Sequence, residues 1–404
     1  MTAVTVDGGS TDTGDSIAAV GAYANTATFK DMDTVTATAG ITGSVYTITG
    51  TTATTVVPGV GIQTITSTSS ATTTISDPTA VTTSIVTGAS TGAYSITPDV
   101  ATTFTTIDAT LSTAGAITVA AQAATNLAMA IQEGTASAAT FTITGGNTGQ
   151  TITVGGVTPS TTAHTFTSTA TSIINYTSAA GIQTITTGVG ADTISAGAGA
   201  DIIAAGTGAN SITGGAGVDA ITGTGTDTIV LNYSNVGAEA DTISSFTTVV
   251  DVLQFDLSAL ETAGTSGIYA TASDFSLLST GVAVATGTTA LVTLEIASAS
   301  TTTAATAASL IVLLDPQYTT TDLLETAFEV GGTEVLTGVT CSAGDSFLVA
   351  YSDGTNVYAA SMYSIYAVSA STFVSGGLVI DNLIQLTGDT AITTGDYVNW
   401  TFIA

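Results

Sequence analysis

Apolar residues recur along the first 177 residues at intervals of eight to eleven, and short runs around them alternate apolar and hydroxylated positions. Alternation with a period of two is the pattern of a half-buried β-strand, and Thr, Val and Ile favour that conformation. Residues 1–177 are therefore predicted to be a Thr-rich β region, built either as a β-sandwich or as an irregular β-solenoid. The large apolar residues that set the interval are Ile48, Val57, Ile65, Ile75, Ile85 and Ile96.

One stretch of this region departs from the strand pattern. The Ala-rich sequence VAAQAATNLAMAIQEGT, residues 119–135, places Leu127, Ala130 and Ile131 on one face of a helix. It predicts one short helix, and the alternative interpretation is an Ala-rich linker.

Residues 236–404 are predicted to form a C-terminal β domain. The runs LVTLEIA and ASLIVLLD have the composition of buried strands. Residues 345–368 predict a β-hairpin with its turn at Asp353 and Gly354, because Asp-Gly between two apolar runs is a strong turn signal.

Between these regions, over residues 178–235, a nine-residue phrase is repeated in phase. Its six Gly-rich residues can turn sharply, and its last three form a short strand whose middle apolar residue points inward. Two phrases make one coil of a parallel β-roll, so phrases two apart share a face. The copies are TGVGADTIS (187–195), AGAGADIIA (196–204), AGTGANSIT (205–213) and GGAGVDAIT (214–222), followed by a shortened GTGTDTIV (223–230).

The charge balance changes how this region is interpreted. The chain has 30 Asp and Glu residues against one Lys and no Arg, for a formal net charge of −29. A chain without a basic patch is a poor partner for nucleic acid or an anionic membrane surface, and no apolar run is long enough for membrane insertion. The carboxylates need a cation from solution, and Ca²⁺ is the expected one because it binds oxygen ligands.

The repeated carboxylates are the candidate calcium ligands. Turns two phrases apart pair Asp201 with Asp219. In the same way Asp192 pairs with Asn210, and Asp227 marks a further site in the shortened copy. Stacked carboxylates repel one another unless a cation lies between them, held by carboxylate and glycine carbonyl oxygens. The glycines assigned to these turns are Gly188, Gly190, Gly197, Gly199, Gly206, Gly208, Gly215 and Gly217.

These repeats resemble the RTX calcium-binding nonapeptides of proteins exported by type I secretion. The resemblance implies a Ca²⁺ cofactor, a parallel β-roll and an extracellular or cell-surface location. Residues 238–260, which include Asp241 and Asp251, resemble the segment that closes such rolls. The tail at 390–404, which is apolar, hydroxylated and free of basic residues, resembles an uncleaved export signal.

No enzyme and no catalytic residue is predicted. The H-E-x-x-H motif of zinc proteases needs two histidines, and His164 is the only one. A G-x-S-x-G match around Ser90 is followed by a proline and β-branched residues, which disfavour the helix that a nucleophile elbow requires.

Together these features favour a secreted structural protein whose partner is itself, as an S-layer lattice subunit or an extracellular filament subunit. A high like charge keeps chains soluble and apart until Ca²⁺ bridges them. By resemblance, a cell-surface polysaccharide is a further expected partner. The alternative is an adhesin or an ice-binding module, since runs such as TITST and TFTST supply residues for threonine ladders. The unequal intervals between strands argue against the flat array that such ladders need.

Overall fold

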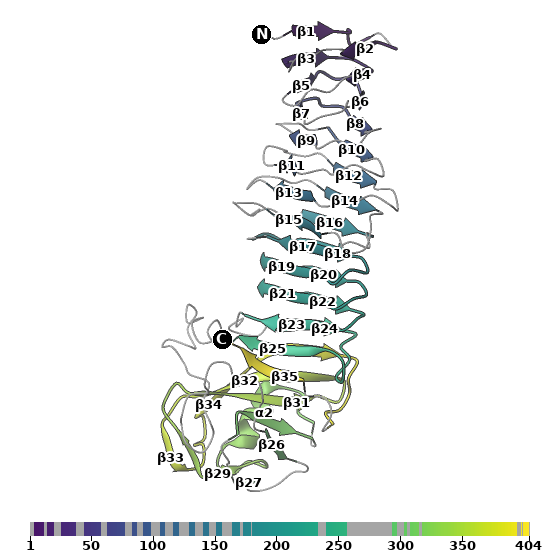
Figure 1. Cartoon of the computed structure of the whole chain (residues 1–404). Helices are drawn as coiled ribbons and strands as arrows, with labels where there is room; N and C mark the ends of the chain where they lie inside the picture. The colour runs from purple at the N-terminus through teal and green to yellow at the C-terminus, as the bar shows by residue number, and fades with distance from the viewer. Residues whose placement is uncertain are drawn as a thin grey trace. The chain divides into compact units, whose positions relative to one another are not determined.

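The structure is a computed structural model of the chain, which forms two compact units, residues 1–210 and 211–404 (Figure 1). Each unit is treated by itself, as unit 1 and unit 2. The residues that the structure describes are 4–11, 14–19, 26–37, 44–57, 63–76, 83–86, 92–97, 106–109, 116–120, 129–133, 140–144, 151–155, 164–169, 173–178, 180–232, 240–256, 293–296, 303–304, 308–314, 317–393, 397 and 399–403.

Unit 1 is a parallel β-solenoid, in which alternate strands belong to two sheets (Figure 1). One sheet runs in the order β1 (Val4–Asp7), β3 (Thr26–Lys30), β5 (Ser44–Thr49), β7 (Gln63–Ser67), β9 (Thr83–Val86), β11 (Thr106–Ala109), β13 (Met129–Glu133), β15 (Thr151–Val154), β17 (Ile173–Thr177) and β19 (Thr193–Ala198). The other runs in the order β2 (Ser16–Ala19), β4 (Thr34–Ala37), β6 (Thr54–Val57), β8 (Thr73–Ser76), β10 (Tyr94–Thr97), β12 (Ala116–Ala120), β14 (Thr140–Thr144), β16 (His164–Ser168), β18 (Gln183–Thr187) and β20 (Ile202–Ala205).

The inward-facing residues of unit 1 form a continuous apolar stack. Val35 is in register with Val56, which is in register with Ile75, and the column continues through Ile96 and Val119. All five side chains are fully buried. The unequal sequence intervals between large apolar residues reflect connections of different length between strands. The apolar residues of neighbouring strands nevertheless pair directly with one another. The described strand pairs of the N-terminal region are all parallel. The solenoid alternative is therefore confirmed for this region, and the sandwich alternative is wrong.

The helix predicted over residues 119–135 is wrong. Strand β12 covers the beginning of this stretch and strand β13 covers residues 129–133, and each pairs in parallel with two neighbouring strands. Residues 121–128 lie outside the described residues. Pairing on both sides satisfies the backbone of these strands and outweighs the helix propensity of alanine, which is worth well under about 1 kcal/mol per residue.

Unit 2 begins with parallel strands and ends in a mixed sheet. One sheet contains β21 (Ser211–Ala216), β23 (Thr228–Leu231), β25 (Val252–Asp256) and β35 (Trp400–Ile403), all parallel. The other runs in the order β22 (Ala220–Gly223), β24 (Asp241–Ser244), β34 (Leu378–Thr387), β32 (Asn356–Ser364), β31 (Ser346–Ser352), β28 (Leu310–Leu313) and β26 (Thr293–Ile296). Two small pairs are formed by segments between these strands: β27 (Thr303–Ala304) with β29 (Leu336–Thr337), and β30 (Val339–Cys341) with β33 (Val368–Ser371).

The segment at 238–260 extends the coils of unit 2. Its strands β24 and β25 each pair on one side with a repeat strand and on the other with β34 or β35. Trp400 of β35 is in register with Leu253, and its ring lies 5.8 Å from that of Phe255. Strands from the end of the chain thus pair with backbone groups that would otherwise form open sheet edges.

The predicted hairpin at 345–368 is confirmed. Strands β31 and β32 pair in antiparallel fashion as far as Ser352 and Val357. The turn between them carries Gly354 at φ +87°, a left-handed conformation that favours glycine. The Oδ1 atom of Asp353 accepts hydrogen bonds from the backbone N–H groups of Thr355 and Asn356, both at 2.7 Å, which fixes the turn.

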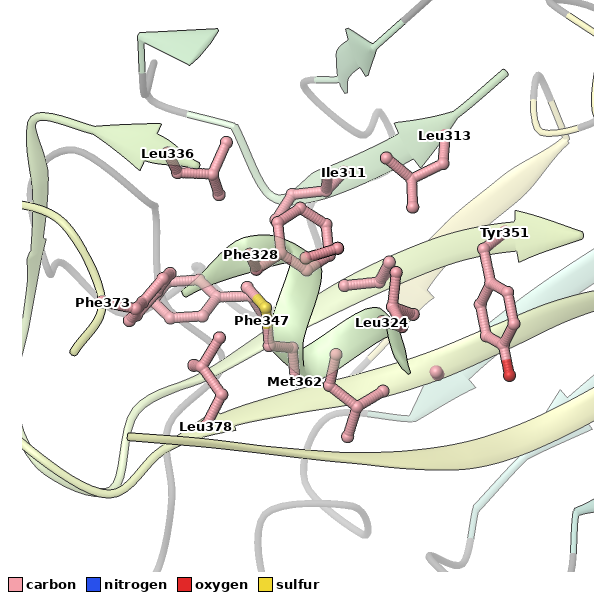
Figure 2. Close-up of a cluster of buried hydrophobic side chains, with 14 of the residues drawn as sticks. Ile311, Leu313, Leu324, Phe328, Leu336, Phe347, Tyr351, Met362, Phe373 and Leu378 are labelled. Carbon is pink, nitrogen blue, oxygen red and sulfur yellow. The ribbon is translucent and has the colours of Figure 1, made fainter. Parts of the chain in front are cut away.

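A helix that the sequence pattern did not predict, α2 (Thr321–Phe328), completes the C-terminal core (Figure 2). Its N-cap residue Thr320 accepts a hydrogen bond from the backbone N–H of Leu323. Leu324 and Phe328 are fully buried in a cluster with Phe347 of β31 and residues of β28, β32 and β34. Burial of each such side chain stabilises the fold by about 1.5–3 kcal/mol. No helix among the described residues is long and apolar enough to cross a membrane.

Candidate calcium site

Glycine at the turns of unit 1 allows successive coils to stack in direct backbone contact. A Cβ atom on Gly206 would lie 1.8 Å from the carbonyl oxygen of Gly188, and one on Gly208 would lie 1.9 Å from that of Gly190. Gly208 also has φ +151°, which other residues rarely adopt. Carbonyl oxygens of one coil therefore lie against the next coil with no side chain between them.

The acidic positions of the repeats point into the turns and not into solvent. Asp192 and Asp201 are each 1% exposed. The Oδ1 atom of Asp192 accepts a hydrogen bond from the backbone N–H of Ile174 at 2.8 Å, and that of Asp201 accepts one from Gln183 at 2.6 Å, in both cases from eighteen residues earlier. Because eighteen residues are two phrases, each carboxylate ties its own coil to the preceding one.

The structure brings together the predicted pair of Asp192 and Asn210. The backbone N–H of Asp192 donates to the Oδ1 atom of Asn210 at 3.0 Å. The Nδ2 atom of Asn210 donates to the carbonyl oxygens of Ala205 and Gly206, at 3.2 and 3.5 Å. An amide can therefore satisfy these carbonyl groups by itself, whereas a carboxylate at the same position would need a cation to do so.

The environment of Asp192 fits a bound cation. Its Oδ2 atom is buried and has no hydrogen-bond partner. Lys30, the only lysine, pairs instead with Asp7 at 2.7 Å and with Asp31 at 3.8 Å. A buried carboxylate oxygen with no donor and no counter-charge is costly unless an ion neutralises it. Calcium suits this position because carboxylate and carbonyl oxygens are its ligands.

Most of the ligand oxygens would come from the backbone. Within the described ranges, no three Asp, Glu, His or Cys side chains gather in a group that could hold a metal. Asp192 would supply a carboxylate oxygen, and the turn carbonyl groups, including those of Gly188 and Gly190, would supply the rest. Bound Ca²⁺ would contribute positive charge and cross-link one coil to the next.

Unit 2 contains the same arrangement of carboxylates. The backbone N–H of Asp219 donates to the Oδ1 atom of Asp241 at 3.0 Å, and that of Asp227 donates to the Oδ1 atom of Asp251 at 2.8 Å. All four residues are at most 5% exposed. A Cβ atom on Gly223 would lie 1.8 Å from the Oδ2 atom of Asp227. The shortened repeat therefore keeps its aspartate in the turn despite the missing residue.

Sequence reasoning did not assign Asp241 and Asp251 to this row of buried carboxylates. They lie 22 and 24 residues after their partners, outside the regular interval of eighteen. The usable signal was the short motif in which an aspartate precedes an apolar residue by two positions, as in Asp241-Thr242-Ile243. Asp201 and Asp219 belong to different units, so their predicted pairing remains a prediction.

The remaining predicted glycines lie in or beside the repeat strands. Gly197 lies within β19, Gly215 lies within β21, and Gly217 follows β21. All three have positive φ angles, of 98°, 108° and 129° respectively. Gly199 has φ +151°, and a Cβ atom there would lie 2.2 Å from the carbonyl oxygen of Gly181. Each of these positions therefore requires glycine, as the repeat pattern predicted.

The first coils of unit 1 show a related bond outside the repeats. The backbone N–H of Asp15 donates to the Oδ2 atom of Asp33 at 2.9 Å, again across eighteen residues. The same oxygen accepts a hydrogen bond from the backbone N–H of Gly14 at 2.6 Å. Bonding between coils through an aspartate is thus not confined to the nonapeptide segment.

Comparison with protein families identifies the repeat segment. The model of the RTX calcium-binding nonapeptide repeat matches residues 178–212 and 199–230, so the segment contains RTX repeats, as expected. RTX repeats bind Ca²⁺, and proteins that carry them are generally exported. Asp241 and Asp251 lie beyond the matched residues. No curated protein and no solved structure matches the chain.

Proposed function

We propose that this chain, which carries Ca²⁺-binding RTX repeats, is a secreted structural protein that folds and assembles with copies of itself at the cell surface when calcium is present. The observation that carries the proposal is the row of buried aspartates in a chain of net charge −29 with a single lysine. The chain has no counter-charge of its own for them, so its folded state depends on a cation from outside.

Calcium binding and folding are coupled, because the ligand oxygens of one site come from different coils. In the unfolded chain these oxygens do not converge, so the ion binds only the folded form. Each independent site then stabilises the fold by about 2.7 kcal/mol when free Ca²⁺ is a hundredfold above its dissociation constant. In the cytosol, where Ca²⁺ is scarce, the repeats would stay unfolded and exportable.

Self-assembly is supported by the composition of the two units. Both are built largely of β-strands, and the high like charge keeps chains apart until a divalent cation screens it. Neither the lattice nor the filament form is favoured by the fold of a single chain. We propose no enzymatic activity, since the buried acidic residues act between coils and serve the scaffold.

Electron microscopy tests this proposal directly. The purified full chain is dialysed in parallel into about 5 mM Ca²⁺, a concentration suited to weak extracellular sites, and into a chelator. Sheets or fibres are expected in Ca²⁺ alone. The variant Asp192→Asn should need more Ca²⁺ to assemble, and the variant Asp322→Asn, at an exposed residue of α2, should not. Separate particles in both buffers would contradict self-assembly.

One observation favours ice binding as a second candidate function. The outward-facing residues of the even-numbered sheet of unit 1 form a continuous ladder of hydroxyl groups, and neighbouring parallel strands lie about 4.8 Å apart. Unequal intervals between the strands do not break this ladder, contrary to the argument from spacing. Its members, in register from strand to strand, are Ser16, Thr34, Thr55, Thr74, Ser95, Thr118, Thr142, Thr167 and Thr186.

Thermal hysteresis separates the two functions. If the ladder binds ice, the full chain in Ca²⁺ depresses the freezing point without depressing the melting point. The variant Thr142→Tyr would abolish that activity. The matched variant Thr153→Tyr, at an exposed residue of the other sheet, would leave it unchanged. Absence of thermal hysteresis in the unmodified chain would exclude ice binding.

A further inference from the structure

Unit 2 contains a cavity of about 260 Å³ that takes no part in the calcium sites. It lies where strands β31, β32 and β34 meet the beginning of helix α2. Its lining combines hydroxyl groups, one carboxylate, one amide and two aromatic rings. The residues that line it are Thr319, Thr320, Thr321, Tyr351, Tyr358, Ile380, Asp381 and Asn382.

A β-bulge shapes one wall of this cavity. In the pairing of β32 with β34, Ala359 faces Ile384 whereas Ala360 faces Asn382, so Leu383 is an extra residue. Consecutive residues of a regular strand point to opposite faces of the sheet. The bulge interrupts this alternation directly after Asn382, and Asp381 and Asn382 both line the cavity. Bulges concentrate next to binding sites for this reason.

The carboxylate of Asp381 is not satisfied by the protein. Its Oδ2 atom is buried and has no hydrogen-bond partner, and burial raises the pKa of this carboxyl group. Asn382 uses its Oδ1 atom to accept a hydrogen bond from the Tyr351 hydroxyl at 2.8 Å, which leaves its Nδ2 atom as a donor. The lining therefore includes a carboxylate residue and, next to it, an amide with a donor to spare.

Two stacked tyrosines also belong to the lining. The rings of Tyr351 and Tyr358 lie 5.0 Å apart and nearly parallel, at 16°. The Tyr358 hydroxyl donates to the Oδ2 atom of Asp353 at 2.9 Å, which holds this ring in place. Figure 2 shows the hydroxyl of Tyr351 directed away from the apolar cluster. These aromatic groups are anchored by the core beneath them, so the cavity is preformed.

We infer that this cavity binds one unit of a neutral saccharide. No positively charged side chain lines it, which argues against an anionic ligand. An organic cation would use the carboxylate of Asp381 but would leave the amide of Asn382 and the threonine hydroxyls without a partner. Sugar hydroxyl groups donate and accept, so they match the polar lining, and the apolar face of a sugar ring can pack on the partly exposed ring of Tyr358. Hydrogen bonds to the charged carboxylate would contribute most.

This inference goes beyond the proposed assembly and can fail without it. The full chain in Ca²⁺ is tested by saturation-transfer NMR and calorimetry against the methyl glycosides of glucose, galactose, mannose, rhamnose and N-acetylglucosamine, with putrescine as a cationic probe. At least one glycoside is expected to bind with a dissociation constant of about 1 mM or tighter. The variant Asp381→Asn should weaken that binding about tenfold or more. The matched variant Asp322→Asn, which removes an exposed carboxylate outside the lining, should change it less than about twofold.

A second variant guards against a folding defect. Thr319→Val keeps the shape of an exposed side chain and removes one hydroxyl, and should weaken binding several-fold with an unchanged circular dichroism spectrum. Binding of no glycoside, binding of putrescine alone, or glycoside binding that survives Asp381→Asn would each overturn the assignment. Calcium-dependent assembly of Asp381→Asn is expected to match that of the unmodified chain.

Discussion

Replacing Asp192 by Asn should have opposite effects with and without calcium. The new side chain keeps an oxygen for the N–H of Ile174, which donates to Asp192 at 2.8 Å. The structure shows that an amide fits such a turn, because Asn210 donates to the carbonyl oxygens of Ala205 and Gly206. Without Ca²⁺, the variant is therefore expected to be as stable as the unmodified chain, or more stable by up to about 3 kcal/mol, since a buried oxygen without a partner is removed.

With Ca²⁺ the sign reverses. Loss of one carboxylate ligand should remove about 2.7 kcal/mol of stabilisation at a hundredfold excess of Ca²⁺ over the dissociation constant of the site. Hydrogen exchange of peptides that cover residues 173–210, measured over a series of Ca²⁺ concentrations, reports the local opening free energy. The curves of the two proteins should cross as Ca²⁺ rises, and Asp322→Asn should follow the unmodified chain. A constant difference at all concentrations would refute the assignment of Asp192 as a ligand.

Three further predictions concern packing and titration. Gly206→Ala should destabilise unit 1 by about 2 kcal/mol or more in chemical denaturation, because its Cβ would lie 1.8 Å from the carbonyl oxygen of Gly188; an unchanged midpoint would contradict the direct stacking of coils. Trp400→Ala should cost about 3–5 kcal/mol in unit 2, since this side chain is 2% exposed and packs on Phe255; calorimetry would show whether the transition moves. Burial raises the pKa of the Asp381 carboxyl group in the folded chain. The stability gained from protonating this group is therefore fully present below the unfolded pKa near 3.8 and is lost as pH rises through the folded pKa. A profile of Tm against pH that is the same for Asp381→Asn and the unmodified chain would rule this out.

The repeat segment could be predicted because each copy carries its own structural signal. Glycines at the turn, an aspartate at one phase and an apolar residue two positions later recur within nine residues, and the structure places Asp192 against Asn210 as the period implies. The hairpin at Asp353 and Gly354 was likewise encoded by neighbouring residues.

The aspartates Asp241 and Asp251 were harder to assign. Their coils are longer than eighteen residues, so the period that identified the other sites did not reach them, although each accepts a hydrogen bond from a backbone N–H of the preceding coil, as Asp192 does. The cavity beside Asp381 was also out of reach of the sequence. It depends on a bulge in β34 and on the docking of α2, both of which are set by contacts between distant segments.

By itself, the sequence determined the strand content, the nonapeptide coils of the Ca²⁺-binding type and the scarcity of basic residues, because each depends on residue type and local spacing. Only the tertiary structure decided between sandwich and solenoid, placed strands β12 and β13 at the described ends of the expected helix, and aligned Ser16 to Thr186 in one ladder. The physical reason is that parallel strands have no local partner. Their register is set by hydrogen bonds to strands about twenty residues away, and those bonds, together with the shared apolar core, outweigh local propensity and absorb unequal turns.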